Sequence, residues 1–303
     1  MRGAGSHGRG RAAAASAAPS SSAPPPPPPP PPRRGSCALV GAGPGPPDLL
    51  TLRAVRALEG ADVVVYDDLG PSEAALAHAP PHAERVFVGK RGGRPSIRQP
   101  EIDATLVDRC LKGLRVVRLK GGCPSVFSRA GSELRALAAA GCAVEIVPGV
   151  SSALAAPLFA GFPLTEADLG RSFTVVSGHA APATDWGALA GADTLVVLMG
   201  GAALPVIAPS LVAAGKAPDT PVAVIRAAGT EEQRVWRSRL ARVVADTAGE
   251  ELSPCIIVVG AVAGIDFAAP GAAPGAAPGA AAGAGSGGGG GGGSQGGSCK
   301  EAG

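Results

Sequence analysis

Short apolar runs alternate with longer amphipathic segments through the first half of the chain. Runs rich in valine, isoleucine and leucine predict strands at residues 37–40, 63–66, 85–88, 115–120 and 143–147. Segments with apolar residues three or four positions apart predict helices at residues 47–58, 99–111, 131–140 and 151–159. This regular alternation indicates an α/β fold with a parallel sheet and right-handed crossovers.

The pattern changes after the loop Gly161–Leu164. Strands are predicted at residues 173–177, 194–198, 221–225, 233–240 and 255–259, with a helix at 204–213. Strands outnumber helices here, so the second sheet is expected to be mixed. The interpretation is two α/β lobes, residues 37–163 and 164–267, with the ligand site in the cleft between them.

Both ends of the chain differ in composition from this middle part. Residues 1–36 are almost entirely Ala, Ser, Gly, Arg and Pro, and residues 268–303 are dominated by Gly, Ala and Pro. Segments with so few large apolar side chains cannot offset the entropy lost on ordering. Both are therefore predicted to be disordered.

The N-terminal arm has the bias of an organelle transit peptide. It contains five arginines and several serines, and the first acidic residue of the chain is Asp48. A plastid location is therefore expected. The alternative is a plain disordered leader on a cytoplasmic protein.

The remaining composition excludes several classes of function. No apolar run is long enough and free enough of Gly, Pro and charge to predict a membrane span. A net charge of +3 is too small to indicate nucleic acid. The six cysteines form no C-x-x-C pair and have no histidine at metal-ligand spacing, so reduced thiols and no metal site are expected.

Two glycine-rich loops follow predicted strands. In Lys120-Gly121-Gly122-Cys123-Pro124 the glycines permit positive φ and close approach of a ligand. Strand carboxyl ends are where open parallel sheets bind ligands, although an ordinary strand-to-helix turn explains this segment equally well. The other loop, residues 41–48, resembles a dinucleotide fingerprint but has Pro46 where the third glycine belongs. This loop therefore indicates the rigid wall of a binding pocket that does not hold a phosphate group.

Many ordered motifs resemble the S-adenosylmethionine-dependent tetrapyrrole methylases, and within them the members that methylate uroporphyrinogen III. The matching segments are Val40–Gly45, Leu49–Ala54, Val65–Asp67, Gly89–Arg91, Gln99–Ile102, Val117–Gly122, Val147–Ala153, Gly161–Thr165, Ser177–His179, Leu198–Gly200, Thr220–Ala223, Gln233–Arg234 and Ile256–Gly260. The resemblance covers roughly residues 38 to 262. Together these motifs are far more specific than any one of them.

The resemblance implies methyl transfer from S-adenosylmethionine to two ring carbons of uroporphyrinogen III, giving precorrin-2, the branch point toward sirohaem and cobalamin. The sulfonium is already a good electrophile and the pyrrole carbon is electron-rich, so the chemistry requires no metal. The protein must align the two reactants and then remove a proton. A homodimer is also expected from this resemblance.

The resemblance also assigns roles to individual residues. The residues expected to line the cofactor pocket are Pro44, Gly121, Gly122, Cys123, Val126, Ser151, Ser152, Met199 and Ala228. Asp67 matches the proposed general base and Lys90 the proposed general acid. Asp67 independently follows a predicted strand, although a turn-capping aspartate and a solvated lysine explain these two residues equally well. The cations expected to bind the substrate's carboxylates are Arg91, Arg118 and Arg129.

Several positions depart from the family pattern. Cys123 replaces an aspartate in the glycine loop, Ser125 a phenylalanine, Pro95 a histidine, Ser132 a glutamate, and Glu166-Ala167 a His-Arg pair. The loss of a carboxylate at Cys123 favours one alternative, a degenerate paralogue that binds tetrapyrrole or cofactor without turnover. The other alternative is a methylase of a later corrin intermediate, which the Gly-Lys-Arg and Gln-x-Glu-Ile motifs argue against.

Overall fold

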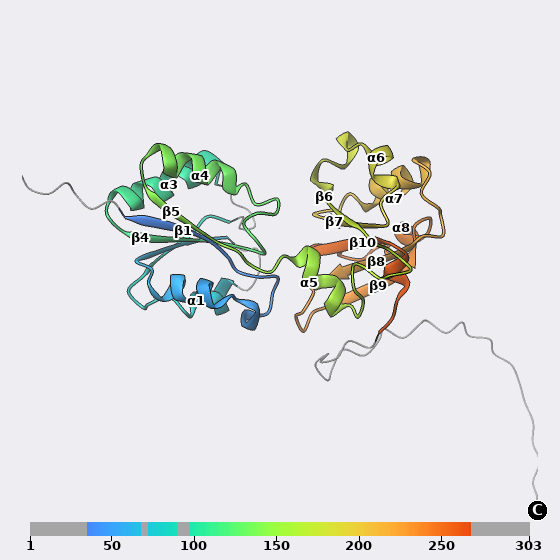
Figure 1. Ribbon diagram of the computed structural model, residues 1–303, viewed down its shortest axis with the longest axis horizontal. Helices are drawn as coiled ribbons and strands as arrows, with labels where there is room; N and C mark the ends of the chain where they lie inside the picture. The colour runs from blue at the N-terminus through green and yellow to red at the C-terminus, as the bar shows by residue number, and fades with distance from the viewer. Residues whose placement is uncertain (1–34, 68–71, 90–96, 268–303) are drawn as a thin grey trace, which may run out of the picture. The chain divides into compact units, whose positions relative to one another are not determined.

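The computed structural model describes residues 35–67, 72–89 and 97–267, and these ranges contain two five-stranded sheets (Figure 1). The first sheet has the order β3-β2-β4-β1-β5, and each of its pairings is parallel. Its strands are β1 (Ser36–Gly41), β2 (Val63–Tyr66), β3 (Glu84–Phe87), β4 (Arg115–Lys120) and β5 (Ala143–Val147). The predicted parallel sheet is confirmed.

Helices cover both faces of the first sheet. They are α1 (Leu52–Glu59), α2 (Ser72–Leu76), α3 (Gln99–Leu111) and α4 (Ala130–Ala139). Leu58 of α1 is buried against one face, while Leu106 of α3 and Leu137 of α4 are buried against the other (Figure 1). The inner strands β2, β4 and β1 are therefore mostly buried and largely apolar, as parallel strands usually are, whereas the edge strands β3 and β5 keep exposed residues such as Glu84 and Ile146.

The helix predicted at residues 47–58 is divided. A short 3-10 turn, η1 (Pro47–Leu49), precedes α1, and Leu50 between them is extended. The Thr51 hydroxyl accepts a hydrogen bond from the Ala54 N–H at 3.1 Å and so caps the start of α1. A threonine cap satisfies a backbone donor that would otherwise lack a partner, so the helix begins after it.

The second sheet has the order β6-β7-β10-β8-β9. Its strands are β6 (Phe173–Ser177), β7 (Thr194–Leu198), β8 (Pro221–Arg226), β9 (Arg234–Arg239) and β10 (Cys255–Gly260). The β6–β7 pair is parallel, whereas the β7–β10, β10–β8 and β8–β9 pairs are antiparallel. The predicted mixed sheet is confirmed.

The second sheet is also covered on both faces. Its helical segments are α5 (Ser152–Phe159), η2 (Gly178–Ala183), α6 (Trp186–Ala190), α7 (Leu204–Ala213), α8 (Val243–Asp246) and η3 (Ala261–Gly264). Trp186, Leu211 and Val243 join the core on one face. Helices α2, α6 and α8 were not expected, because such short segments have too few turns to show a periodic pattern.

Helix α5 packs on the second sheet, although it precedes the lobe boundary expected after Pro163. Ala153 and Ala156 lie in one buried cluster with Val196 of β7 and Val258 of β10. The Arg237 guanidinium of β9 also donates to the Ala160 carbonyl at the end of this helix, at 2.7 Å. The division of the chain at residue 163 stays a prediction.

Other sequence expectations concern segments with little or no described structure. The predicted N-terminal arm, except for residues 35 and 36, and the predicted tail at 268–303 lie outside the described residues. Within the described ranges, no helix has the length and apolarity needed to cross a membrane. The same ranges contain no group of three or more His, Cys, Asp or Glu side chains arranged to hold a metal ion.

Candidate active site

The order of the first sheet brings the predicted chemistry to one edge. Strands β2, β4, β1 and β5 are successive neighbours and run parallel, so their carboxyl ends lie side by side. Asp67 follows β2, the Gly121-Gly122 loop follows β4, and the first glycine loop follows β1. This is the edge at which open parallel sheets bind ligands.

The two glycine loops are joined through their backbones. The Gly43 N–H donates to the Gly122 carbonyl at 3.2 Å, and the Gly122 N–H donates back to the Gly43 carbonyl at 2.8 Å. A Cβ on Gly149 would lie 2.2 Å from the Gly122 carbonyl oxygen, which no side chain tolerates. Gly122 itself has φ +66°, a conformation that favours glycine. Close backbone packing therefore explains Gly149, whereas a Cβ on Gly122 would meet only the Ser151 Cα, at 4.0 Å, so it is the positive φ that favours glycine at residue 122.

Cys123 uses hydrogen-bond donors that could serve a carboxylate. Its Sγ lies 3.0 Å from the Ser125 hydroxyl oxygen, within the turn that follows Gly122. Burial acts to raise the pKa of the Cys123 thiol, but hydrogen bonds from Ser125 and from the Gly149 N–H together lower it. The Ser125 hydroxyl and the Gly149 N–H are thus placed where they could stabilise negative charge at residue 123.

The remaining cofactor residues predicted beside the first sheet are accessible to different degrees. Pro44, Val126 and Ser152 are half-buried, and Ser151 is buried. The Ser151 hydroxyl accepts a hydrogen bond from the Ala153 N–H at 3.3 Å and caps α5. It therefore has a structural role, and its own O–H can still donate to a ligand.

Met199 and Ala228 share one edge of the second sheet. Met199 follows β7 and Ala228 lies in the loop after β8. Each strand is antiparallel to β10, so β7 and β8 point the same way. Met199 has φ +57° and is half exposed, and Ala227 has φ +46°. Such backbone strain in non-glycine residues is concentrated at functional sites, which supports a binding role for this edge.

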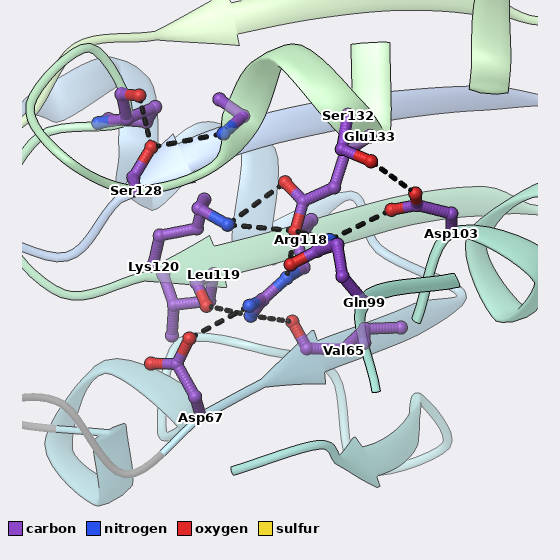
Figure 2. A network of polar contacts seen from close by, with 12 residues as sticks. Val65, Asp67, Gln99, Asp103, Arg118, Leu119, Lys120, Ser128, Ser132 and Glu133 are labelled. Carbon is purple, nitrogen blue, oxygen red and sulfur yellow. Dashed lines mark hydrogen bonds and ion pairs between the residues drawn. The ribbon is translucent and has the colours of Figure 1, made fainter. Parts of the chain in front are cut away.

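Asp67 ends a network of buried charges (Figure 2). Arg118 of β4 has a side chain only 4% exposed, and its Nη2 donates to Asp67 Oδ2 at 2.8 Å. The same guanidinium donates through Nη1 to the Leu119 carbonyl at 2.7 Å and to the Val65 carbonyl at 3.4 Å. A guanidinium held by several acceptors is rigid, so it fixes the orientation of Asp67.

Glu133 of α4 provides the second carboxylate of this network. Its side chain is fully buried, and Oε1 accepts from Arg118 Nε at 3.1 Å. Lys120 Nζ donates to both carboxylate oxygens of Glu133, at 2.8 and 2.9 Å (Figure 2). Burial lowers the pKa of Lys120, and the neighbouring Arg118 charge adds to this effect, while Glu133 opposes it. Two buried cations are therefore balanced by two carboxylates.

A polar extension connects Glu133 to α3. Gln99 Nε2 donates to Asp103 Oδ1 at 2.8 Å and reaches Glu133 Oε1 at 3.5 Å. The Ser132 hydroxyl donates to Asp103 Oδ2 at 2.6 Å. Ser132 stands where the family pattern has glutamate. A hydroxyl suits this position because a glutamate carboxylate here would be repelled by the Asp103 carboxylate.

The predicted catalytic and substrate-binding cations have different outcomes. Lys90 and Arg91 lie outside the described residues, so their roles stay predictions. The Arg118 guanidinium is occupied by internal acceptors, so binding a substrate carboxylate would require it to exchange one of them. Arg129 is exposed and lines a pocket of about 430 Å³ beside Phe127. Of the two described cations, Arg118 is held by internal acceptors and Arg129 lines a pocket.

Sequence reasoning missed Glu133 and Lys120. One signal was available: Arg118 and Lys120 are two positions apart on the strand Arg115–Lys120, so both point to the same face. Buried cations require nearby carboxylates. The pattern did not show which acidic residue would supply one.

The chain belongs to the tetrapyrrole (corrin/porphyrin) methylases, whose family model matches residues 36–244. It is 46% identical over 228 residues to a uroporphyrinogen-III C-methyltransferase of Synechococcus elongatus, a match that covers 75% of this chain and 93% of the relative. It is 42% identical over 233 residues to a siroheme synthase of Pseudomonas fluorescens, of which it spans about half the length (50%).

A solved structure has the same fold. The uroporphyrin-III C-methyl transferase of Thermus thermophilus, complexed with S-adenyl homocysteine, matches with a TM-score of 0.64 and 40% identity. The match covers 75% of this chain and 98% of the Thermus chain. The family predicted from the motifs is thereby confirmed.

Proposed function

We propose that the chain transfers methyl groups from S-adenosylmethionine to two ring carbons of uroporphyrinogen III, giving precorrin-2. The observation that carries this proposal is the 46% identity to the Synechococcus C-methyltransferase over 93% of that protein's length. The Thermus relative with bound S-adenyl homocysteine supports the choice of methyl donor.

The residues present fit the methyl donor. Gly122 has no side chain between the carboxyl end of β4 and Ser151, and Met199 presents a half-exposed side chain at the edge of the second sheet. S-adenosylmethionine supplies an electrophilic methyl group. The task of this chain is to align donor and ring carbon, with Gly121, Gly122, Cys123, Met199 and Ala228 as the binding residues.

Asp67 is proposed to remove the proton from the methylated ring carbon. Its carboxylate is 15% exposed and lies at the edge of the sheet beside the glycine loops. Arg118 holds one carboxylate oxygen through a 2.8 Å hydrogen bond. A carboxylate held in a fixed orientation at the site is what general-base catalysis requires.

The test is incubation of the full chain with uroporphyrinogen III and S-adenosylmethionine under anaerobic conditions. The expected product has gained two methyl groups by mass spectrometry and has the absorbance of precorrin-2. A heat-inactivated sample is the control. Tetrapyrrole binding without any methyl transfer would overturn the proposal in favour of a binding paralogue, an alternative motivated by Cys123. Methylation only of a later corrin intermediate would assign a different methylase.

Assembly and location extend the proposal. We infer a homodimer, which sedimentation of the purified chain tests; a monomer at micromolar concentration would contradict it. We also infer that residues 1–36 direct the protein to a plastid, because this arm is rich in Ala, Arg and Ser and lacks acidic residues. Fusion of these residues to a fluorescent reporter tests this, and a diffuse cytosolic signal would contradict it.

A further inference from the structure

Of the four charged groups around Arg118, Asp67 is the most exposed. The side chains of Arg118, Lys120 and Glu133 are 4%, 5% and 0% exposed, whereas Asp67 is 15% exposed. Asp67 follows β2 and is thus the member of this group that lies at the edge proposed as the site, and Figure 2 shows its bond to Arg118. Any change of charge deeper in the network acts on Asp67 through little water, and hence with little screening.

Glu133 and Lys120 have opposite electrostatic effects on Asp67. Glu133 accepts from both Arg118 and Lys120, so it partly neutralises the positive charge that faces Asp67. Lys120 neutralises Glu133 in turn and interacts electrostatically with Asp67. Both side chains are buried, although Lys120 is the last residue of β4 and directly precedes Gly121.

We propose that Glu133 and Lys120 are positioning residues that set the proton affinity and the orientation of the Asp67 carboxylate through Arg118. This inference rests on the proposed function in one respect: the catalytic role of Asp67 comes from that proposal. The electrostatic coupling itself is a property of the free protein.

The groups that face this network come from each element packed against it. β4 contributes Arg118 and Lys120, α4 contributes Glu133, and α3 contributes Gln99 and Asp103. β1 contributes the thiol of Cys37, whose pKa is raised chiefly by its hydrogen bond with Cys110 and by burial, with a smaller effect of the Glu133 charge. Among the described residues, Asp103 reaches Glu133 only through Gln99, so Glu133 and Lys120 are the charges chosen for variation behind Arg118.

The experiment measures Asp67 directly in the full chain. Protein labelled with ¹³C at the aspartate carboxyl carbons is titrated by NMR, and Asp67→Asn identifies its signal. Glu133→Gln removes a negative charge at constant size, so the Asp67 midpoint should fall. Lys120→Met removes a positive charge, so the midpoint should rise. Each shift should be about half a pH unit or more, as expected for a charge close to a carboxyl group.

The double variant Lys120→Met/Glu133→Gln restores the charge balance, so its midpoint should return close to that of the wild type. Glu145→Gln, which changes an exposed carboxylate on β5, is the matched control and should leave the midpoint unchanged. Circular dichroism checks that each variant is folded. If Glu133→Gln does not fold, Lys120→Met and the double variant still test the sign of the shift.

A second readout connects the coupling to catalysis. The acid limb of the pH profile for kcat/KM should move in the same directions as the NMR midpoints. Equal midpoints in the wild type and both single variants would overturn the inference, whatever the activity. Absence of methyl transfer by the wild type, with shifted midpoints, would instead overturn the proposed function and leave the coupling intact.

Discussion

Strands β4 and β10 are the middle strands of the two sheets, and they differ in what they bury. β10 has the sequence CIIVVG and places only apolar side chains in its core. β4 has the sequence RVVRLK and buries two cations, Arg118 and Lys120. A middle strand of a covered sheet needs no charge for its stability, and buried ion pairs are seldom more stabilising than apolar residues. The difference indicates that β4 was shaped by function as well as by packing.

The largest expected effect is on turnover through Asp67. Asp67→Asn should preserve cofactor binding and slow kcat by roughly 10²- to 10⁴-fold, the usual contribution of a positioned general base. Methyl-transfer rates at saturating substrate measure this, and calorimetry of cofactor binding is the control. Equal rates for the two proteins would show that Asp67 serves only as a partner for Arg118.

The second prediction compares the two middle strands by stability. Glu133→Ala leaves Arg118 and Lys120 without their shared carboxylate, so it should lower the free energy of unfolding by about 3 to 5 kcal/mol. Ile257→Val in the apolar core of β10 should cost only about 0.5 to 1.5 kcal/mol. Urea unfolding measures both. A smaller loss for Glu133→Ala than for Ile257→Val would contradict the view that the β4 charges depend on one another.

A smaller effect is expected at the loop that follows β4. The donors around Cys123 can hold a carboxylate, so Cys123→Asp should restore the charge typical of the family and tighten S-adenosylmethionine binding by about 1 to 2 kcal/mol. Cys123→Ser, which adds no charge, is the control. A dissociation constant that is unchanged or weaker by calorimetry would show that the loop has been rebuilt around the thiol.

The smallest effect is expected from the ends of the chain. Removing residues 1–34 and 269–303 should leave the melting temperature unchanged, because their composition provides little apolar surface to bury against either sheet. Differential scanning calorimetry of the shortened and full chains makes the comparison. A fall of several degrees would mean that one of the tails contributes to a core.

Much of the fold could be predicted because burial is periodic along the chain. The helix at Gln99–Leu111 and the strands at Ala143–Val147 and Thr194–Leu198 were predicted with the bounds that the structure has. The division of the helix predicted at 47–58 was missed, since the Thr51 cap acts within a segment whose apolar pattern continues through it. The packing of α5 on the second sheet was also missed, because an apolar helix between two sheets matches either of them.

The sequence by itself determined where most strands and helices lie, that the first sheet is parallel, and which motifs place the chain among the tetrapyrrole methylases. The tertiary structure decided the partners of the buried charges. Arg118 contacts Asp67, just after β2, and Glu133 of α4, residues separated from it by 51 and 15 positions. Periodicity shows which face of an element is buried, but it carries no information on which distant side chain lies opposite. That depends on the order of the strands and the placement of the helices, which are properties of the whole fold.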